Sequence, residues 1–209
     1  MTDHSVTKSR PRRPEARPAE ILDAALDLFA ERGFAATRLD DVASRAGLSK
    51  AAIYLYFKDK TSLLKAVVES VASPNLALAG DLVAAHKGPV APLLQHLLGF
   101  MAGRMRQTRL PDLIKLVISE SRAHPELGRF YLEHVIGKAL PLFEQLIARG
   151  IASGEFRAVD PRLTVKCLIG PMLLGAIWKS VFEPIGAEPL DIEALARHQG
   201  ELITRALQP

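Results

Sequence analysis

Two tyrosines and three lysines around residue 55 carry the side-chain chemistry that stands out most in this sequence. Tyr54 and Tyr56 each combine a flat apolar ring with a hydroxyl group, and Lys50, Lys58 and Lys60 add positive charge within the same short stretch. Together such groups can hydrogen-bond and neutralise a polyanion such as a nucleic-acid backbone. What they can reach depends on the elements that present them.

The segment 39–57 has the spacing of two short helices joined by a tight turn. Ala43 is small enough for a close helix crossing, Gly47 can adopt the positive φ of a turn, and Ser49 can cap a second helix that carries Ile53. This pattern predicts a helix-turn-helix motif, in which the second helix lies in the DNA major groove. The alternative is an ordinary pair of amphipathic helices in an all-α protein.

The start of the first helix adds to the prediction. Thr37-Arg38-Leu39-Asp40 fits a capping box, with Thr37 accepting a hydrogen bond from the first turn and Asp40 reaching back. The free N–H groups at such a helix start suit a phosphate. We therefore expect this end of the first helix to face the same ligand as the tyrosines.

A longer pattern surrounds the motif. It runs through Ala24-Ala25-x-x-Leu28-Phe29-x-x-x-Gly33-Phe34, Thr37, Val42-Ala43-x-x-Ala46-Gly47-Leu48-Ser49-Lys50 and Tyr54-x-Tyr56-Phe57-Lys58-x-Lys60-x-x-Leu63. With this pattern, the segment from Ile21 to Leu64 strongly resembles the DNA-binding domain of TetR/AcrR-type transcriptional regulators. Ala51-Ala52 departs from it, because family members often carry Gly-Thr or a similar small pair there, and which bases are read stays open.

The resemblance implies a homodimeric repressor that leaves a palindromic operator in double-stranded DNA when a small-molecule effector binds. It also makes Lys60 similar to the family's phosphate-contacting lysine. The alternatives are a TetR-type activator, and a ligand-binding carrier or interaction module whose DNA-binding head has lost its function. The predicted DNA contacts are Thr37, Arg38, Ser49, Lys50, Ala51, Ala52, Tyr54, Tyr56 and Lys60.

The composition fits a folded protein of the cytoplasm. The chain has 209 residues, of which 48% are hydrophobic, and a formal net charge of +4, so it can bury a core and tolerates a nucleic-acid partner. Cys167 is the only cysteine, which excludes an intrachain disulfide. No apolar signal segment opens the sequence, and the most apolar run, Cys167 to Trp178, is shorter than the ~20 residues that span a bilayer. We expect no membrane partner.

The sequence offers little to an enzyme. It lacks a glycine-rich phosphate loop and a Gly-x-Ser-x-Gly elbow, and its histidines show no paired ligand spacing with carboxylates or cysteine. The lone Cys167 lies within an apolar helical pattern, where a thiol is expected to be inert. We therefore predict no catalytic residue, no metal site and no cofactor.

The chain divides into three predicted parts. Residues 1–17 hold five basic and two acidic residues and few hydrophobic ones, so we expect a disordered basic arm, either a solvated tail or a segment that contacts DNA. Residues 18–72 should form the helix-turn-helix domain with a linking helix from Lys60 to about Ala72, ended by Ser73-Pro74. Residues 73–209 should form a ligand-binding and dimerisation domain.

No strand alternation is found, so the predicted fold is all-α, with about nine or ten helices. A first helix from Pro18 to Gly33 should brace the motif. The candidate helices beyond the linking helix are Leu76–Lys87, Val90–Arg106, Pro111–Ala123, Glu126–Ile151 with a bend at Gly137 or Pro141, Pro161–Phe182 and Leu190–Leu207.

The last two helices are apolar on more than one side, which suits a four-helix interface across a two-fold axis as well as an internal core. Small molecules bind between the helices of bundles, so a pocket is expected between residues 76 and 178. The candidate dimer residues are Gly170, Leu174, Ile177, Val181, Leu195 and Leu202. The candidate ligand-binding residues, each of which fits plain core or surface as well, are Phe100, Met101, Met105, Glu120, Phe143 and Trp178.

Overall fold

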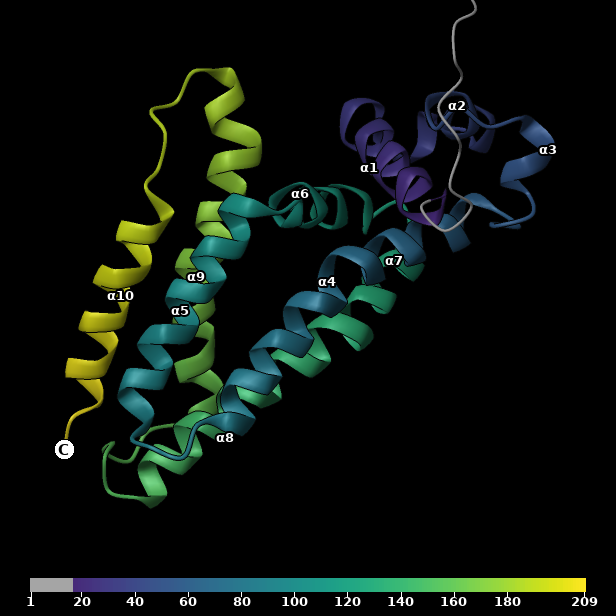
Figure 1. The fold of residues 1–209 in the computed structure, drawn as a ribbon. Helices are drawn as coiled ribbons and strands as arrows, with labels where there is room; N and C mark the ends of the chain where they lie inside the picture. The colour runs from purple at the N-terminus through teal and green to yellow at the C-terminus, as the bar shows by residue number, and fades with distance from the viewer. Residues whose placement is uncertain (1–16) are drawn as a thin grey trace, which may run out of the picture.

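The computed structural model describes residues 17–209, and within that range the predicted all-α fold is confirmed (Figure 1). The predicted basic arm lies outside the described residues except for Arg17, which begins the first helix. The elements are α1 Arg17–Ala36, α2 Leu39–Arg45, α3 Lys50–Ile53, α4 Lys60–Ala85, α5 Val90–Gln107, α6 Leu110–Glu120, α7 Pro125–Tyr131, the π-helical turn η2 Leu132–Ile136, α8 Gly137–Ala152, α9 Pro161–Ile177, the π-helical turn η3 Trp178–Phe182, the short 3₁₀ turn η4 Glu183–Ile185 and α10 Ile192–Leu207.

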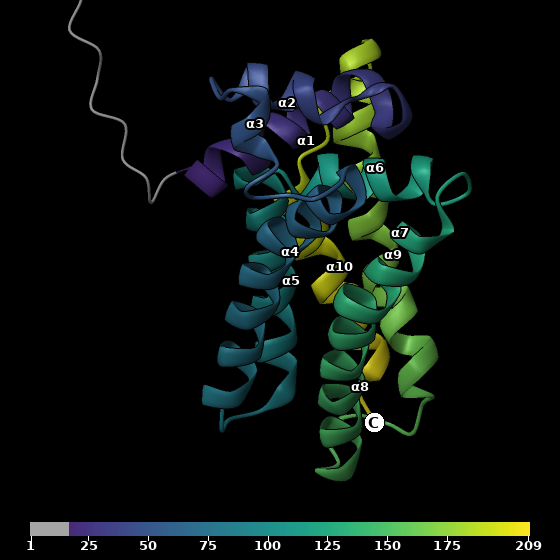
Figure 2. The same ribbon diagram turned by 90° about the vertical axis from the view of Figure 1, so that its right-hand side faces the viewer.

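The helices form two groups, which we call the head (α1 to α3) and the body (α5, α8, α9 and α10). Figure 2 shows the head above the long helices, with α4 running from one group to the other. In Figure 1, α6 crosses from the body to the head, and it packs against both α1 and α9. The two groups are therefore connected by α4, by α6, and by α7, which packs on the head core and continues through η2 into α8.

Each group has its own hydrophobic core. The head core includes Ile21, Phe29 and Ile53, but Leu113 and Leu116 of α6 and Leu127 of α7 complete it. The body core is built by α5, α8, α9 and α10, with Ala79 of α4 at its edge. The head core thus takes in residues well beyond position 72, so the predicted N-terminal domain does not close its core alone.

The linking helix is longer than predicted. We expected Ser73-Pro74 to end it, but α4 runs on to Ala85 with Pro74 inside, so the separate helix from Leu76 does not exist. Proline cannot donate to the carbonyl four residues earlier. That carbonyl belongs to Ser70, an exposed residue, and the side-chain amide Nδ2 of Asn75 donates to the next carbonyl, Val71 O (2.6 Å).

A second internal proline is compensated by a neighbouring helix. Pro171 in α9 leaves the carbonyl of Cys167 without its helical donor. The amide nitrogen of Gln199 in α10 donates to that carbonyl (3.2 Å) and to Leu168 O (2.6 Å). Gln199 is 5% exposed, so this polar side chain fixes the register of α10 against the apolar α9.

The end of α8 illustrates how closely the body is packed. A Cβ atom added at Gly150 would overlap the ring of Phe156, which is 3% exposed. Gly99 in α5 is exposed, and a Cβ atom there would meet open space. A side chain is therefore excluded by packing at Gly150 but not at Gly99.

We expect Gly150→Ala to destabilise the protein by about 1–3 kcal/mol, because a buried ring must move to admit the methyl group. Gly99→Ala should instead stabilise it by about 0.5–1 kcal/mol through helix propensity. Denaturant unfolding followed by circular dichroism measures both. Equal effects from the two substitutions would contradict the packing described at Gly150.

Candidate nucleic-acid interface

The turn between α2 and α3 has the predicted geometry. Gly47 has φ +66°, a conformation that glycine adopts at low cost. The chain then reverses, with the N–H of Leu48 donating to Ala43 O (2.8 Å). Val42 and Ile53 are both 0% exposed, so each helix of the pair is anchored by a fully buried side chain. The helix-turn-helix motif predicted from the sequence is thus formed.

The second helix of the motif is short. Ser49 caps it as predicted, its Oγ accepting from Ala52 N (3.2 Å). The α-helix ends at Ile53, and single turns continue the winding to Phe57, whose N–H donates to Ile53 O (3.0 Å). The predicted reading segment from Ser49 to Tyr56 is therefore one helical turn followed by a looser one.

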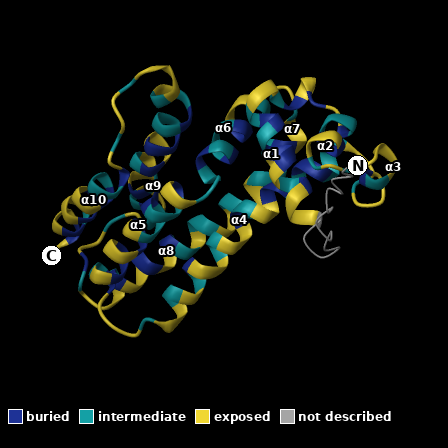
Figure 3. Cartoon of the chain, turned by 45° about the horizontal axis from the view of Figure 1, so that its top comes forward, coloured by how far each residue is buried: buried dark blue, intermediate teal, exposed yellow. Residues whose placement is uncertain are grey.

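The residues of this segment point outward. Tyr54 is 54% exposed and Tyr56 is 43% exposed, and Lys50 and Ala51 are exposed as well, with Ala52 half-buried. In Figure 3 the segment around α3 is coloured mainly as exposed, at the end of the molecule away from the body. Ile53 packs one side of this short helix against the head, and the opposite side is accessible to a binding partner.

The cap of α2 differs from the prediction by one residue. Thr37 is 1% exposed, and its single O–H points to Gly33 O (2.8 Å), with Leu28 O also within reach (3.2 Å); among the described residues no N–H of α2 donates to it. The N-cap is Arg38, whose N–H donates to Asp41 Oδ2 (3.1 Å). The physical reason lies in α1, where the non-helical Gly33 (φ +80°) leaves carbonyl groups that Thr37 satisfies.

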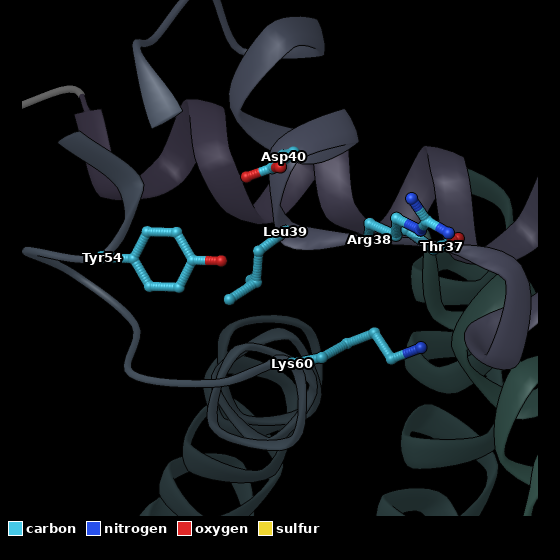
Figure 4. Close-up of a pocket in the computed structure, with 6 residues that line it drawn as sticks. All are labelled: Thr37, Arg38, Leu39, Asp40, Tyr54 and Lys60. Carbon is cyan, nitrogen blue, oxygen red and sulfur yellow. The ribbon is translucent and has the colours of Figure 1, made fainter. Parts of the chain in front are cut away.

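A shallow depression separates α2 from the start of α4, with a volume of about 330 Å³. Figure 4 shows the ring of Tyr54 on one side of it and the side chain of Lys60 reaching along the other. Five of its six lining residues are polar or aromatic, so it can accommodate part of a phosphate backbone. The lining residues are Thr37, Arg38, Leu39, Asp40, Tyr54 and Lys60.

Several cations of the head are already paired. Lys50 Nζ lies 2.7 Å from Asp40 Oδ2, and this hydrogen bond and the attraction of the carboxylate raise the pKa of Lys50. Arg45 forms a bidentate pair with Glu31 (2.9 and 3.1 Å). Arg38 is exposed and makes no ion pair with any residue in the range 17–209. Arg38 therefore presents more of its charge to a partner than Lys50 does.

The side chain of Lys60, the first residue of α4, binds the C-terminal end of α1. Its ammonium group donates to Phe34 O (2.5 Å) and Ala35 O (3.0 Å) and lies 4.4 Å from the centre of the Phe34 ring. Burial lowers the pKa of Lys60, and the charge of Glu120 partly opposes that shift. The start of α4 is thereby fixed to the end of α1, with Asp59 as the predicted cap, accepting from Ser62 N (2.6 Å).

Glu120 lies at the junction of head and body. Its Oε1 accepts from Phe34 N (3.3 Å), and its Oε2 lies 3.9 Å from His124 Nε2. At the other end of α6, Arg109 pairs with Asp27 of α1 at 2.6 Å. The sequence placed Glu120 either in a ligand cavity or on the open surface, and the structure instead places its carboxylate against α1.

The other predicted ligand-binding residues divide into two groups. Met105 and Phe143 belong to the body core, and Phe100 and Met101 pack against it. Trp178 is half-buried in η3, where its indole N–H donates to Glu188 O (2.8 Å) and its ring packs on Phe182. The structure thus brings four of the six together and leaves Glu120 and Trp178 elsewhere.

The predicted dimer residues all retain exposed surface in the single chain. Gly170 is exposed, Leu174 is 49% exposed and Leu202 is 54% exposed. Ile177, Val181 and Leu195 are half-buried. The outer sides of α9 and α10 therefore carry apolar groups that the body core does not cover.

Family models of known proteins match both parts of the chain. Residues 21–67 match the model of bacterial regulatory proteins of the tetR family, and residues 84–191, just over half of the chain, match that of the tetracyclin repressor-like C-terminal domain. The chain belongs to the TetR family. The family is one of transcriptional regulators, so this TetR-family protein is a helix-turn-helix transcriptional regulator, as the resemblance implied.

Individual relatives agree over most of their length. The HTH-type regulator YfiR of Bacillus subtilis is 28% identical over 93% of each chain, and RutR of Escherichia coli is 29% identical over 78% of this chain and 76% of its own. The fold is similar to that of FadR from Bacillus subtilis in complex with stearoyl-CoA, with a TM-score of 0.74, 22% identity, and coverage of 91% and 99%.

One exposed residue of the candidate interface, Leu55, is absent from the contacts predicted from the sequence. Leu55 is 86% exposed between the two tyrosines. It lies two residues from the buried Ile53 and four from Ala51, so the helical phase alone placed it on the outward face. Its side chain has neither a charge nor a hydrogen-bonding group, so the residue type gave no sign of a DNA contact.

We expect Lys60→Met to lower the stability of the protein by about 1–2 kcal/mol, because Phe34 O and Ala35 O lose a charged donor while the side-chain stem is kept. Lys58→Met, two residues earlier and exposed, is the matched control and should change stability little. Denaturant unfolding measures both, and a Lys60→Met variant as stable as Lys58→Met would show that the ammonium group does not hold α1 to α4.

Proposed function

We propose that this TetR-family regulator binds a palindromic operator in double-stranded DNA as a homodimer, and that a small molecule bound in its body releases it. The outward presentation of Tyr54 and Tyr56 above the fully buried Ile53 is the observation that carries the proposal. A helix-turn-helix with this exposure can enter the major groove without unfolding any part of the head. Repression follows if the operator overlaps a promoter, and an activator would dock in the same way.

We assign the predicted DNA contacts to different roles. Ser49, Ala51 and Ala52 begin the reading segment and approach the base edges, while Arg38, Lys50 and the tyrosine hydroxyls contact phosphates. Thr37 acts from inside, by fixing the end of α1 next to Arg38. Lys60 can reach a phosphate only if its ammonium leaves the two carbonyls of α1, so we assign it first to holding the head together.

We propose the outer sides of α9 and α10 as the dimer interface. The segment Pro161–Ile185 is long and apolar enough to cross a membrane by length and composition, and only 33% of its most apolar window is buried in the single chain. A second copy would cover the remainder, because a two-fold axis places the same face of each protomer against its equal. This assignment also agrees with a cytoplasmic protein without a membrane partner, which we propose as its location.

The proposed effector acts through α4 and α6, each of which contacts both head and body. FadR was solved with stearoyl-CoA, which supports a small-molecule site in a body of this fold. Phe100, Met101, Met105 and Phe143 are the candidates for its lining. A ligand that favours one arrangement of α4 and α6 shifts the spacing of the two heads and weakens DNA binding by linkage.

A regulator and a carrier with an inactive head differ in DNA affinity. A duplex selected by the wild-type protein from a random-sequence pool should contain an inverted repeat, and binding should weaken steeply as salt rises. Arg38→Ala should reduce the slope of log affinity against log salt by about one for each protomer. Arg129→Ala, at an exposed position of α7, is the matched control. A wild-type protein that enriches no sequence would support the carrier.

We expect Leu174→Glu to convert the protein to a monomer in sedimentation equilibrium, because its side chain is exposed in one chain but covered in the proposed dimer. Affinity for the full inverted repeat should fall at least tenfold, while affinity for a duplex with one half-site stays unchanged. Leu132→Glu, at a side chain that is 55% exposed on η2, should remain dimeric. A Leu174→Glu variant that is still a dimer would refute the assigned interface.

A further inference from the structure

The outward face of the reading segment is apolar at its centre. Ile53 is fully buried, and side chains two residues to either side of it on a helix point to the opposite side. Ala51 lies two residues before Ile53 in α3, and Leu55 lies two residues after it in the looser turn that follows; both are exposed. Leu55 is the most exposed large hydrophobic side chain of residues 18–209, at 86%.

The same segment is poor in groups that read bases by hydrogen bonds. Bidentate pairing with guanine or adenine uses arginine, lysine, asparagine or glutamine, and between residues 49 and 57 only Lys50 is of these types. Lys50 is paired with Asp40 at 2.7 Å, and the oxygen of Ser49 accepts from Ala52 N, which leaves Ser49 a single O–H donor for a base. Apolar contact is therefore the main way in which this face can distinguish one base pair from another.

The 5-methyl group of thymine is the apolar group that the major groove offers on its base edges. We propose that Leu55, together with Ala51, reads thymine methyl groups and so sets the sequence preference of each half-site. This inference rests on the proposed function, since it requires α3 in the major groove. Solvent exposure of an isobutyl group in the free protein is then explained, because the group is covered only on DNA.

Deoxyuridine tests the proposal, because it lacks only the methyl group of thymidine. The probe is the duplex that the wild-type protein selects from a random pool, with each thymine of a half-site replaced singly by uracil. One or two of these replacements should weaken wild-type binding by about three- to tenfold. Leu55→Ala should bind the thymine and uracil duplexes within twofold of one another. Leu132→Ala, at an exposed leucine of the body, should keep the wild-type preference.

Two results would overturn the proposal while leaving the proposed function intact. The first is a selected half-site in which no thymine-to-uracil replacement changes wild-type affinity. The second is a Leu55→Ala variant that loses affinity equally for both duplexes, which would place Leu55 against sugars or phosphates. Failure of the wild-type protein to select any duplex would instead refute DNA binding itself. Leu55 is exposed, so an unchanged unfolding midpoint verifies that the variant is folded.

Discussion

The end of α1 is the constraint on which the head and its attachment depend. Gly33 leaves the helical conformation at φ +80°, and the backbone groups around it need new partners. The hydroxyl of Thr37 donates to Gly33 O, and the ammonium group of Lys60 donates to Phe34 O and Ala35 O. The carboxylate of Glu120 accepts from Phe34 N. Those three side chains come from the α1–α2 connection, from α4 and from α6, so one break in a helix fixes three other elements.

This arrangement connects the reading segment to the body through short paths. α4 begins at Lys60, six residues after Tyr54, and α6 ends at Glu120 after passing from the body core to the head core. Both helices meet α1 within a few residues of each other. A change in the relative position of α4 and α6 therefore acts directly on the end of α1, to which both helices are hydrogen-bonded.

Local signals in the sequence were enough to predict the motif. Gly47, the Ser49 cap, the Asp59 cap and the buried Ile53 each depend on residues within one or two turns, and the structure has all four. The cap of α2 was misplaced because the hydroxyl of Thr37 bonds to the carbonyl groups of Gly33 and Leu28. That use of the hydroxyl depends on the break of α1 at Gly33, and the sequence pattern does not show it. Pro74 was misread as a helix end, because it removes a donor only from the carbonyl of Ser70, which lies at an exposed position of α4.

Long-range contacts could not be predicted in the same way. Glu120 follows an apolar run, which is equally compatible with a cavity, an open surface or a buried hydrogen bond, and its partner Phe34 lies 86 residues away. Gln199 resembles any polar residue of an amphipathic helix until Pro171 of α9 is placed beside it. Such residues are identified by the backbone groups that other segments leave unsatisfied, and these depend on the tertiary arrangement.

The balance of charges in the head bears on how DNA affinity would be controlled. Within the head, Lys50 and Arg45 are paired with carboxylates, and next to it Lys60 of α4 is bound to carbonyl groups of α1. Arg32, Arg38 and Lys58 are exposed and form no ion pair within residues 17–209. The reading segment that these cations flank is only two turns long. On the proposed function, strong binding requires two heads at the correct separation, because the second contact is then intramolecular. On the same proposal, affinity depends on that separation, and a shift of α4 and α6 that changes it would release the protein from DNA.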